Sequence, residues 1–239
     1  MVANANATTF EFDGLGDGSA VDSPTNVGNI VQNCGTAGGD FCTLDFAEGF
    51  DYSEDGIFFN AAAFSGGTGL GTDGFVRGAP ALLIQDLIGP NQGLGVISTS
   101  EFTNGTPASV SADQINFDTG ESILFTFLEE TNISQIFLNS GTSGDCPDLD
   151  SSEGPCGEVG VIVDGVLNTF TDFVGAGILA DGGSAVSLIG TTFEFVSLTA
   201  GGGFSIESFV VGVPIPGAIP LLLSGIAGLG FASRKKKKA

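Results

Sequence analysis

The heptapeptide Ser122-Ile123-Leu124-Phe125-Thr126-Phe127-Leu128 decides the fold class of this chain. Ile123, Phe125 and Phe127 stand at every second position, which places them on one face of a β-strand. Similar short apolar or alternating runs recur along the chain, separated by Gly, Asn, Asp and Ser, residues typical of turns. The runs are 8–12, 41–46, 56–60, 81–85, 94–98, 122–128, 133–139, 158–163, 166–170, 191–198 and 204–211.

This pattern predicts an all-β domain over residues 8–212. About a dozen short strands with irregular loops, and no long helical apolar stripe, indicate an antiparallel two-sheet sandwich that is jelly-roll-like. Asp164-Gly165 separates two of the runs and predicts a two-residue hairpin. A turn is expected between 122–128 and 133–139. The 21 phenylalanines are assigned to the core.

The charge of the chain excludes one class of partner. All 28 acidic residues precede residue 213, whereas Arg77 is the one basic residue that does. Residues 1–212 therefore carry a net charge of −27. Nucleic acid requires a positive face, so we expect no nucleic-acid partner. The domain is also not expected to dock on anionic lipid. A generally acidic, solvated surface explains the charge most simply.

The residue types present also restrict catalysis. The chain has no histidine, so neither a Ser-His-Asp triad nor a Cys-His pair can be built. Paired carboxylates of the kind that glycosidases use remain possible. With 28 acidic residues, however, such a pair has almost no specificity as a signal. We therefore predict that the protein is not an enzyme.

The four cysteines form two pairs that are close in sequence, Cys34 with Cys42 and Cys146 with Cys156. Four cysteines allow three connectivities, and local pairing within each loop is the simplest. Disulfides are expected if the protein is exported to an oxidising compartment. A zinc site built from these residues would lack the usual C-x-x-C spacing.

Calcium is the one cofactor that the sequence suggests. Asp145, Asp148, Asp150 and Glu153 crowd the loop between the second pair of cysteines. Carboxylate oxygens on loops suit Ca²⁺, although the segment does not match the EF-hand pattern. A solvated acidic loop explains the same residues without any metal.

The C-terminal segment 213–239 differs in character from the rest. Val213-Pro214-Ile215-Pro216-Gly217-Ala218 begins it, and an uncharged apolar stretch follows. Residues 215–232 include no charge, which is the lower limit for a membrane-spanning segment. We expect one transmembrane helix at about 218–233. The segment ends in a basic cluster, expected on the cytoplasmic side, that consists of Arg234, Lys235, Lys236, Lys237 and Lys238.

A proline motif, an apolar helix and a basic terminus in this order resemble the PEP-CTERM sorting signal, and specifically its VPLPA-type variant. The sequence has Ile215 where the variant has Leu, and Gly217 stands before Ala218. The resemblance covers about a ninth of the chain, 27 of 239 residues. It implies processing by an exosortase-type enzyme in a Gram-negative bacterium that makes exopolysaccharide.

The resemblance implies the function as well. An exported protein would first be anchored in the inner membrane and would then reach the cell surface or the extracellular matrix. There it would associate with exopolysaccharide or biofilm without catalysis of its own. The alternative is a calcium-dependent carbohydrate-binding module anchored to the surface. Residues 1–7 contain A-x-A patterns and are read as the remnant of an export signal or a disordered start.

Overall fold

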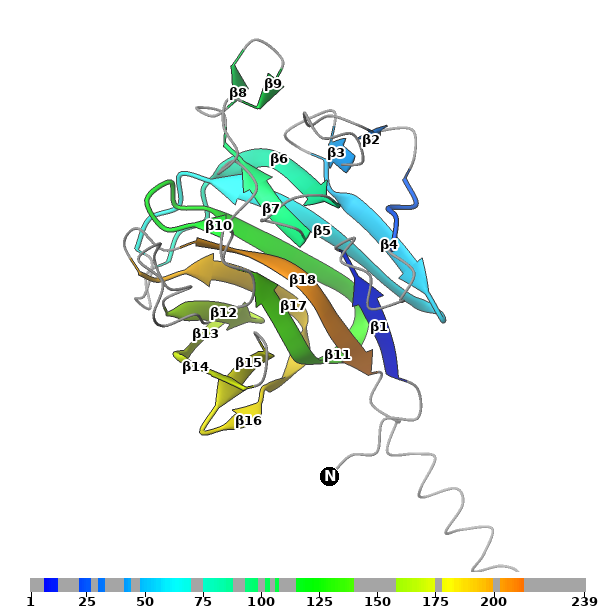
Figure 1. The fold of residues 1–239 in the computed structure, drawn as a ribbon, viewed down its shortest axis with the longest axis vertical. Coiled ribbons are helices and arrows are strands. Elements are labelled where there is room, and N and C mark those ends of the chain that lie inside the picture. The colour runs from blue at the N-terminus through cyan, green and yellow to red at the C-terminus, as the bar shows by residue number, and fades with distance from the viewer. Residues whose placement is uncertain are drawn as a thin grey trace, which may run out of the picture.

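The computed structural model consists of β-strands joined by turns and loops (Figure 1), and the residues that it describes contain no helix. An all-β fold is therefore confirmed. The described residues are 7–12, 22–26, 30–32, 41–43, 48–69, 75–87, 93–98, 102–103, 106–107, 115–139, 158–174, 178–199 and 203–212.

The longest strand, β11 (Ser122–Asn139), organises the sheet. Its first half pairs with β5 (Ile57–Ser65) on one side and with β17 (Ser187–Ser197) on the other. Its second half keeps β17 but exchanges β5 for β18 (Gly203–Gly212). The exchange follows a register shift between Thr126 and Thr131. This irregularity replaces the turn expected between 122–128 and 133–139, so that prediction was wrong.

The strand pairing closes on itself. From β11 it runs through β5, β6 (Ala79–Asp86) and β7 (Gly93–Ile97) to β18, which returns to β11. Every pairing between the strands of the described residues is antiparallel, as the sequence predicted. Sixteen strands belong to one continuous sheet, so a separation into two stacked sheets is not confirmed.

The other strands extend this circuit. Two strands lie beside β18, namely β1 (Ala7–Glu11) and β10 (Ile115–Asn116), and β4 (Phe50–Glu54) lies beside β5. The hairpin of β12 (Val159–Val163) and β13 (Val166–Phe170) lies beside β17. β15 (Ile178–Asp181) pairs with β11 and also with β14 (Asp172–Val174) and β16 (Ser184–Ala185), while β3 (Phe41–Thr43) pairs with β6 and with β2 (Ile30–Gln32). A separate two-stranded sheet holds β8 (Phe102–Thr103) and β9 (Thr106–Pro107).

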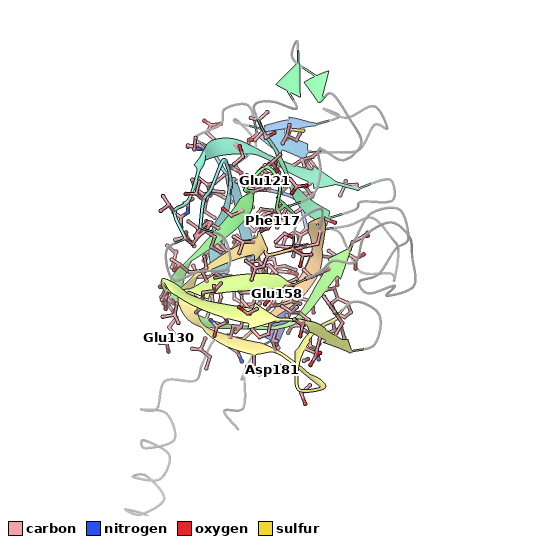
Figure 2. All side chains as sticks on the ribbon, turned by 90° about the vertical axis from the view of Figure 1, so that its left-hand side faces the viewer. Phe117, Glu121, Glu130, Glu158 and Asp181 are labelled. Atoms are coloured by element: carbon pink, nitrogen blue, oxygen red, sulfur yellow. The ribbon has the colours of Figure 1, made fainter. Side chains whose placement is uncertain are left out.

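The core consists largely of aromatic rings, with Phe59 at its centre. The centroid of this ring lies 4.8 Å from that of Phe10, 5.0 Å from that of Tyr52 and 4.9 Å from that of Phe127. The contact with Phe10 is edge-to-face and the one with Tyr52 is stacked, and both arrangements add to the stabilisation that burial provides. Most phenylalanines of the described residues are buried, as predicted, but Phe58 is 49% exposed. Figure 2 shows side chains filling the interior, with Glu130 and Asp181 at the periphery.

Two Asp-Gly turns close adjacent strands. Asp164 and Gly165 have φ of 47° and 85°, and they join β12 to β13 with Val163 paired to Val166. The predicted hairpin is confirmed, because both central residues of a type I′ turn need positive φ. Asp55 and Gly56, with φ of 50° and 81°, join β4 to β5 in the same way. The strand β4 was not predicted, although this Asp-Gly turn follows it directly.

Candidate functional site

Four polar side chains lie in a row across the outer face of the sheet. Asp51 on β4 is paired with Asn60 on β5, Asn60 with Thr126 on β11, and Thr126 with Thr192 on β17. Residues directly opposite each other on neighbouring strands point to the same face. Strands lie about 4.8 Å apart, so these four positions extend over about 14 Å. We call these four residues the polar row.

A groove of about 580 Å³ covers the end of the polar row on β4, β5 and β11. Its most exposed apolar residues are Phe58, which is 49% exposed, and Leu128, which is 80% exposed. Hydroxyl, amide and carboxylate groups surround them, and these come from Thr25, Asp51, Ser53, Asn60 and Thr126. We call this the first groove. Its walls combine a flat apolar ring with hydrogen-bonding groups.

The polar end of the first groove is held in place by short hydrogen bonds. The Asn60 amide donates to Asp51 Oδ1 over 2.8 Å. The Asp51 backbone N–H donates to Asn26 Oδ1 over 3.0 Å, and the Thr25 hydroxyl donates to the Asp51 carbonyl over 2.9 Å. Asn26 in turn donates to the Gly49 carbonyl over 2.8 Å. Asp51 and Asn60 are therefore oriented before any ligand arrives.

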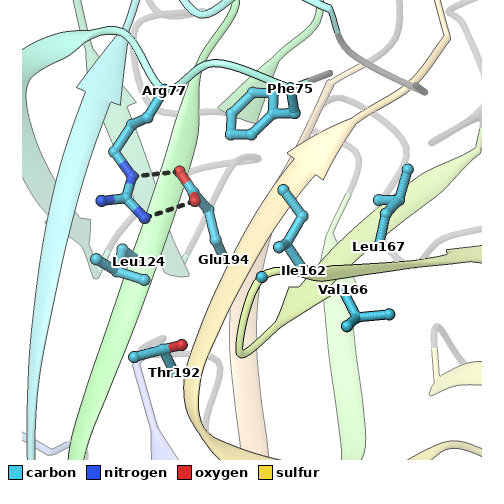
Figure 3. A pocket seen from close by; sticks show the side chains of 9 residues that line it. Phe75, Arg77, Leu124, Ile162, Val166, Leu167, Thr192 and Glu194 are labelled. Atoms are coloured by element: carbon cyan, nitrogen blue, oxygen red, sulfur yellow. Dashed lines mark hydrogen bonds and ion pairs between the residues drawn. The ribbon is translucent and has the colours of Figure 1, made fainter. Parts of the chain in front are cut away.

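A second groove of about 470 Å³ lies over β11, β17 and the β12–β13 hairpin. Two hydrogen bonds join Arg77 to Glu194 (Figure 3): Nε donates to Oε1 over 2.8 Å, and Nη2 donates to Oε2 over 2.7 Å. Ser122 Oγ donates to the same Oε1 over 2.7 Å. The guanidinium carbon also lies 4.8 Å from the centroid of the Phe64 ring. The hydrogen bonds to Glu194 raise the pKa of Arg77, so its guanidinium stays charged.

The two grooves meet at the polar row. Thr126 lines the first groove and Thr192 lines the second, and the two residues are direct partners across β11 and β17. Beyond Thr192, the turn residue Asp164 accepts hydrogen bonds from the Thr192 hydroxyl over 3.0 Å and the Thr192 N–H over 2.9 Å. The outer face of the sheet is thus one continuous surface with two hollows.

Tyr52 lines the first groove but offers no exposed ring to it. It is the sole tyrosine of the chain and therefore the sequence's best candidate for stacking on a sugar. The structure buries it to 2% exposure, and its hydroxyl donates to Gln85 Oε1 over 2.8 Å. Desolvation raises the pKa of Tyr52 well above its ordinary value. The exposed aromatic ring at the first groove is instead Phe58, which alternation along 56–60 could have placed on the outer face.

Most residues that the sequence singled out lie outside the described residues. These are the sorting motif Val213, Pro214, Ile215, Pro216, Gly217 and Ala218, the basic cluster 234–238, Cys34, Cys146 and Cys156, and the candidate calcium ligands Asp145, Asp148, Asp150 and Glu153. Cys42 lies on β3 and is not a free thiol. Its partner lies outside the described residues, so the proposed pairing stays a prediction.

The described ranges contain neither a cluster of metal-ligating side chains nor a helix that could span a membrane. No group of three or more His, Cys, Asp or Glu side chains there is placed to hold a metal ion. No helix in that part of the chain is long and apolar enough to cross a membrane, and the predicted helix at 218–233 lies outside it.

Comparisons with known proteins do not assign the chain to a family: no family model, no curated protein and no solved structure matches it. The proposals below therefore rest on the residues and their geometry, and on the resemblance of the tail.

Proposed function

We propose that the chain is an exported protein of the cell surface or extracellular matrix that is delivered by its C-terminal segment and performs no catalysis. The observation that carries this is the position of the last strand. β18 ends at Gly212, and Val213 begins the proline motif. Ala7 at the start of β1 is paired with Gly212, so the chain enters and leaves the fold at one edge (Figure 1).

This arrangement suits a removable tail. Cleavage at or near Val213–Ala218 would remove no residue of β18, because that strand is complete at Gly212. Pro214 and Pro216 have no backbone donor and disfavour helix in the preceding residue, so we expect the motif to be extended and accessible to an enzyme. The partner would be an exosortase-type enzyme, and the membrane contact would be the helix at about 218–233.

The finer features of the fold belong to the same proposal. We propose that the strand circuit packs as a jelly-roll-like sandwich, supported by the aromatic core that several strands share. Local disulfides Cys34–Cys42 and Cys146–Cys156 are proposed for the oxidising compartment that export implies. The strongly acidic domain would remain soluble and would not adhere to nucleic acid or anionic lipid.

The test is the intact mass of surface material from a host that carries an exosortase, compared with the same host lacking that enzyme. We expect loss of up to 27 of the 239 residues in the first strain and an intact Lys238-Ala239 terminus in the second. A Pro214→Ala/Pro216→Ala variant should be processed poorly, whereas a Pro24→Ala variant should be processed normally. A full-length C-terminus in both strains would show that the segment is only an anchor.

The calcium-dependent carbohydrate-binding module is the second candidate. The first groove favours its carbohydrate part, because an exposed aromatic ring stands beside hydroxyl, amide and carboxylate groups. Its calcium part depends on Asp145, Asp148, Asp150 and Glu153, which lie outside the described residues. Titration of the protein with Ca²⁺ after chelation tests that part, and no heat and no change in melting temperature would reject it.

A further inference from the structure

We propose that the outer face formed by the polar row and the two grooves binds a neutral oligosaccharide chain, laid across the strands and held without a metal ion. This deepens the proposed association with exopolysaccharide and rests on it. The argument comes from the placement of apolar groups, from hydrogen-bonding groups and from charge.

The exposed apolar side chains of the described residues concentrate on this face. Five large hydrophobic residues are exposed, and three of them line the grooves, namely Phe58, Leu128 and Val166. Single exposed hydrophobic residues need no explanation, whereas a cluster rimmed by polar groups marks a binding surface. Phe58 offers the aromatic ring on which the C–H face of a sugar can stack.

The hydrogen-bonding groups match the hydroxyls at the edge of a sugar ring. Asp51 is exposed, and the Asn60 amide donates to its Oδ1. The Asp51 carboxylate and the side-chain carbonyl of Asn60 are both acceptors for sugar hydroxyls. Hydrogen bonds to a carboxylate are stronger than those between neutral groups. The hydroxyls of Thr126 and Thr192 continue the same line over about 14 Å, which is long enough for more than one sugar ring.

Charge selects a neutral chain over other polymers. Arg77 is the one cation of residues 1–212, and both of its bonded nitrogens are committed to Glu194. The one cation of this face is thus already paired with a carboxylate, which offsets its attraction for a uronate, sulfate or phosphate group. The net charge of −27 would repel an anionic chain as it approached. A neutral chain rich in hydroxyls meets neither obstacle.

A second copy of this chain is disfavoured as the occupant for the same reason. Self-association would bring together two domains that each carry −27.

Within the described residues no three metal-ligating side chains gather, so this binding is expected to be independent of calcium.

The experiment uses the full-length protein in detergent micelles with EDTA present. Calorimetry with cellohexaose, maltohexaose, laminarihexaose, mannohexaose and chitohexaose should give binding to at least one, with an alginate hexamer as the anionic control. Phe58→Ala and Asp51→Asn should each weaken that binding at least tenfold. Their matched controls are Ile189→Ala, another exposed hydrophobic residue, and Asp172→Asn, another exposed carboxylate, and both should bind normally.

Several outcomes would overturn the inference. They are no binding at millimolar concentration, equal binding by all four variants, loss of binding in EDTA, or preference for alginate. Sedimentation of the same samples tests whether the face instead binds a second copy of the chain. A dimer that Phe58→Ala dissociates would identify the face as a self-association surface. Tail processing is measured separately in cells, so failure here and failure of the sorting proposal remain distinguishable.

Discussion

Replacing Arg77 by Gln should destabilise the protein markedly, because it leaves the Glu194 carboxylate buried without its cation. The side chain of Glu194 is 4% exposed and that of Arg77 is 40% exposed, and two hydrogen bonds of 2.8 and 2.7 Å join them. Removing one partner of a fully buried ion pair costs about 3–5 kcal/mol, whereas exposed pairs contribute about 0–1 kcal/mol.

Because the Arg77 side chain is 40% exposed, the cost of breaking this ion pair should lie between the values for buried and exposed pairs. Water can replace part of what Arg77 provides, and Ser122 still donates to Glu194 Oε1 over 2.7 Å. We therefore expect Arg77→Gln to lower the free energy of unfolding by about 2–3 kcal/mol. For a domain of this size that corresponds to a fall in melting temperature of roughly 5–10 °C.

A double-mutant cycle separates the pair from other effects of the substitution. Glu194→Gln leaves Arg77 in contact with water, so this substitution should lower the free energy of unfolding by less, about 1 kcal/mol. The double variant Arg77→Gln/Glu194→Gln should lose less than the two single variants together, by at least about 1 kcal/mol. Arg77→Lys keeps the charge but not the two-pronged geometry, so its stability should be intermediate.

Urea denaturation of the full-length protein in detergent, followed by far-ultraviolet circular dichroism, measures all four variants. The single tyrosine, Tyr52, provides a second probe because the chain has no tryptophan. A loss below about 0.5 kcal/mol for Arg77→Gln, with additive single variants, would refute the reasoning. Glu194 would then be compensated by groups other than Arg77.

Two further predictions concern the turn residue Asp164 and the buried Tyr52. Asp164 Oδ1 accepts four hydrogen bonds, from the N–H and the hydroxyl of both Thr191 and Thr192, at 2.9–3.1 Å. Desolvation raises the pKa of Asp164, but these hydrogen bonds outweigh it, so the pKa is lowered. Asp164→Ala should therefore cost about 1 kcal/mol at pH 7. The difference from the native protein should shrink as the pH falls through and below about 4, because a lowered pKa gives stability that protonation removes. Melting curves from pH 3 to 7 check this, and a difference that does not change with pH would contradict it. Tyr52→Phe removes the donor to buried Gln85 Oε1 and should cost about 1–2 kcal/mol in urea denaturation; an unchanged midpoint would mean that another donor reaches Gln85.

Local signals in the sequence predicted much of the strand content. Alternation along 122–128 placed Ile123, Phe125 and Phe127 in the core, and all three are at most 5% exposed. The Asp164-Gly165 turn was predicted because its chemistry is confined to two residues. The bend of β11 was mistaken for a turn, since a bulge within a strand depends on the neighbours that it pairs with, here β17 and β18.

The candidate site could not be predicted in the same way. Its polar row joins residues 51, 60, 126 and 192, and only the first two are linked by a local signal, the Asp55-Gly56 turn. The register of β5 against β11, and of β11 against β17, follows from how the whole aromatic core packs. A slip of one residue in either pairing would turn the outer residues inward. For the same reason, the sequence identified Arg77 as the one cation of the domain but not Glu194 as its partner.

The use of that single cation connects the fold to the proposed function. Glu194 lies at 3% exposure on β17, where an isolated carboxylate would be costly, and Arg77 reaches it from 117 residues earlier in the chain. No basic residue then remains in residues 1–212 to pair with the other 27 acidic residues. This charge distribution would repel anionic surfaces and other copies of the domain, and it would not oppose the uncharged ligand that we propose for the outer face. A protein of this charge distribution is suited to remaining dispersed within a hydrated, neutral polysaccharide, in agreement with the function that we propose.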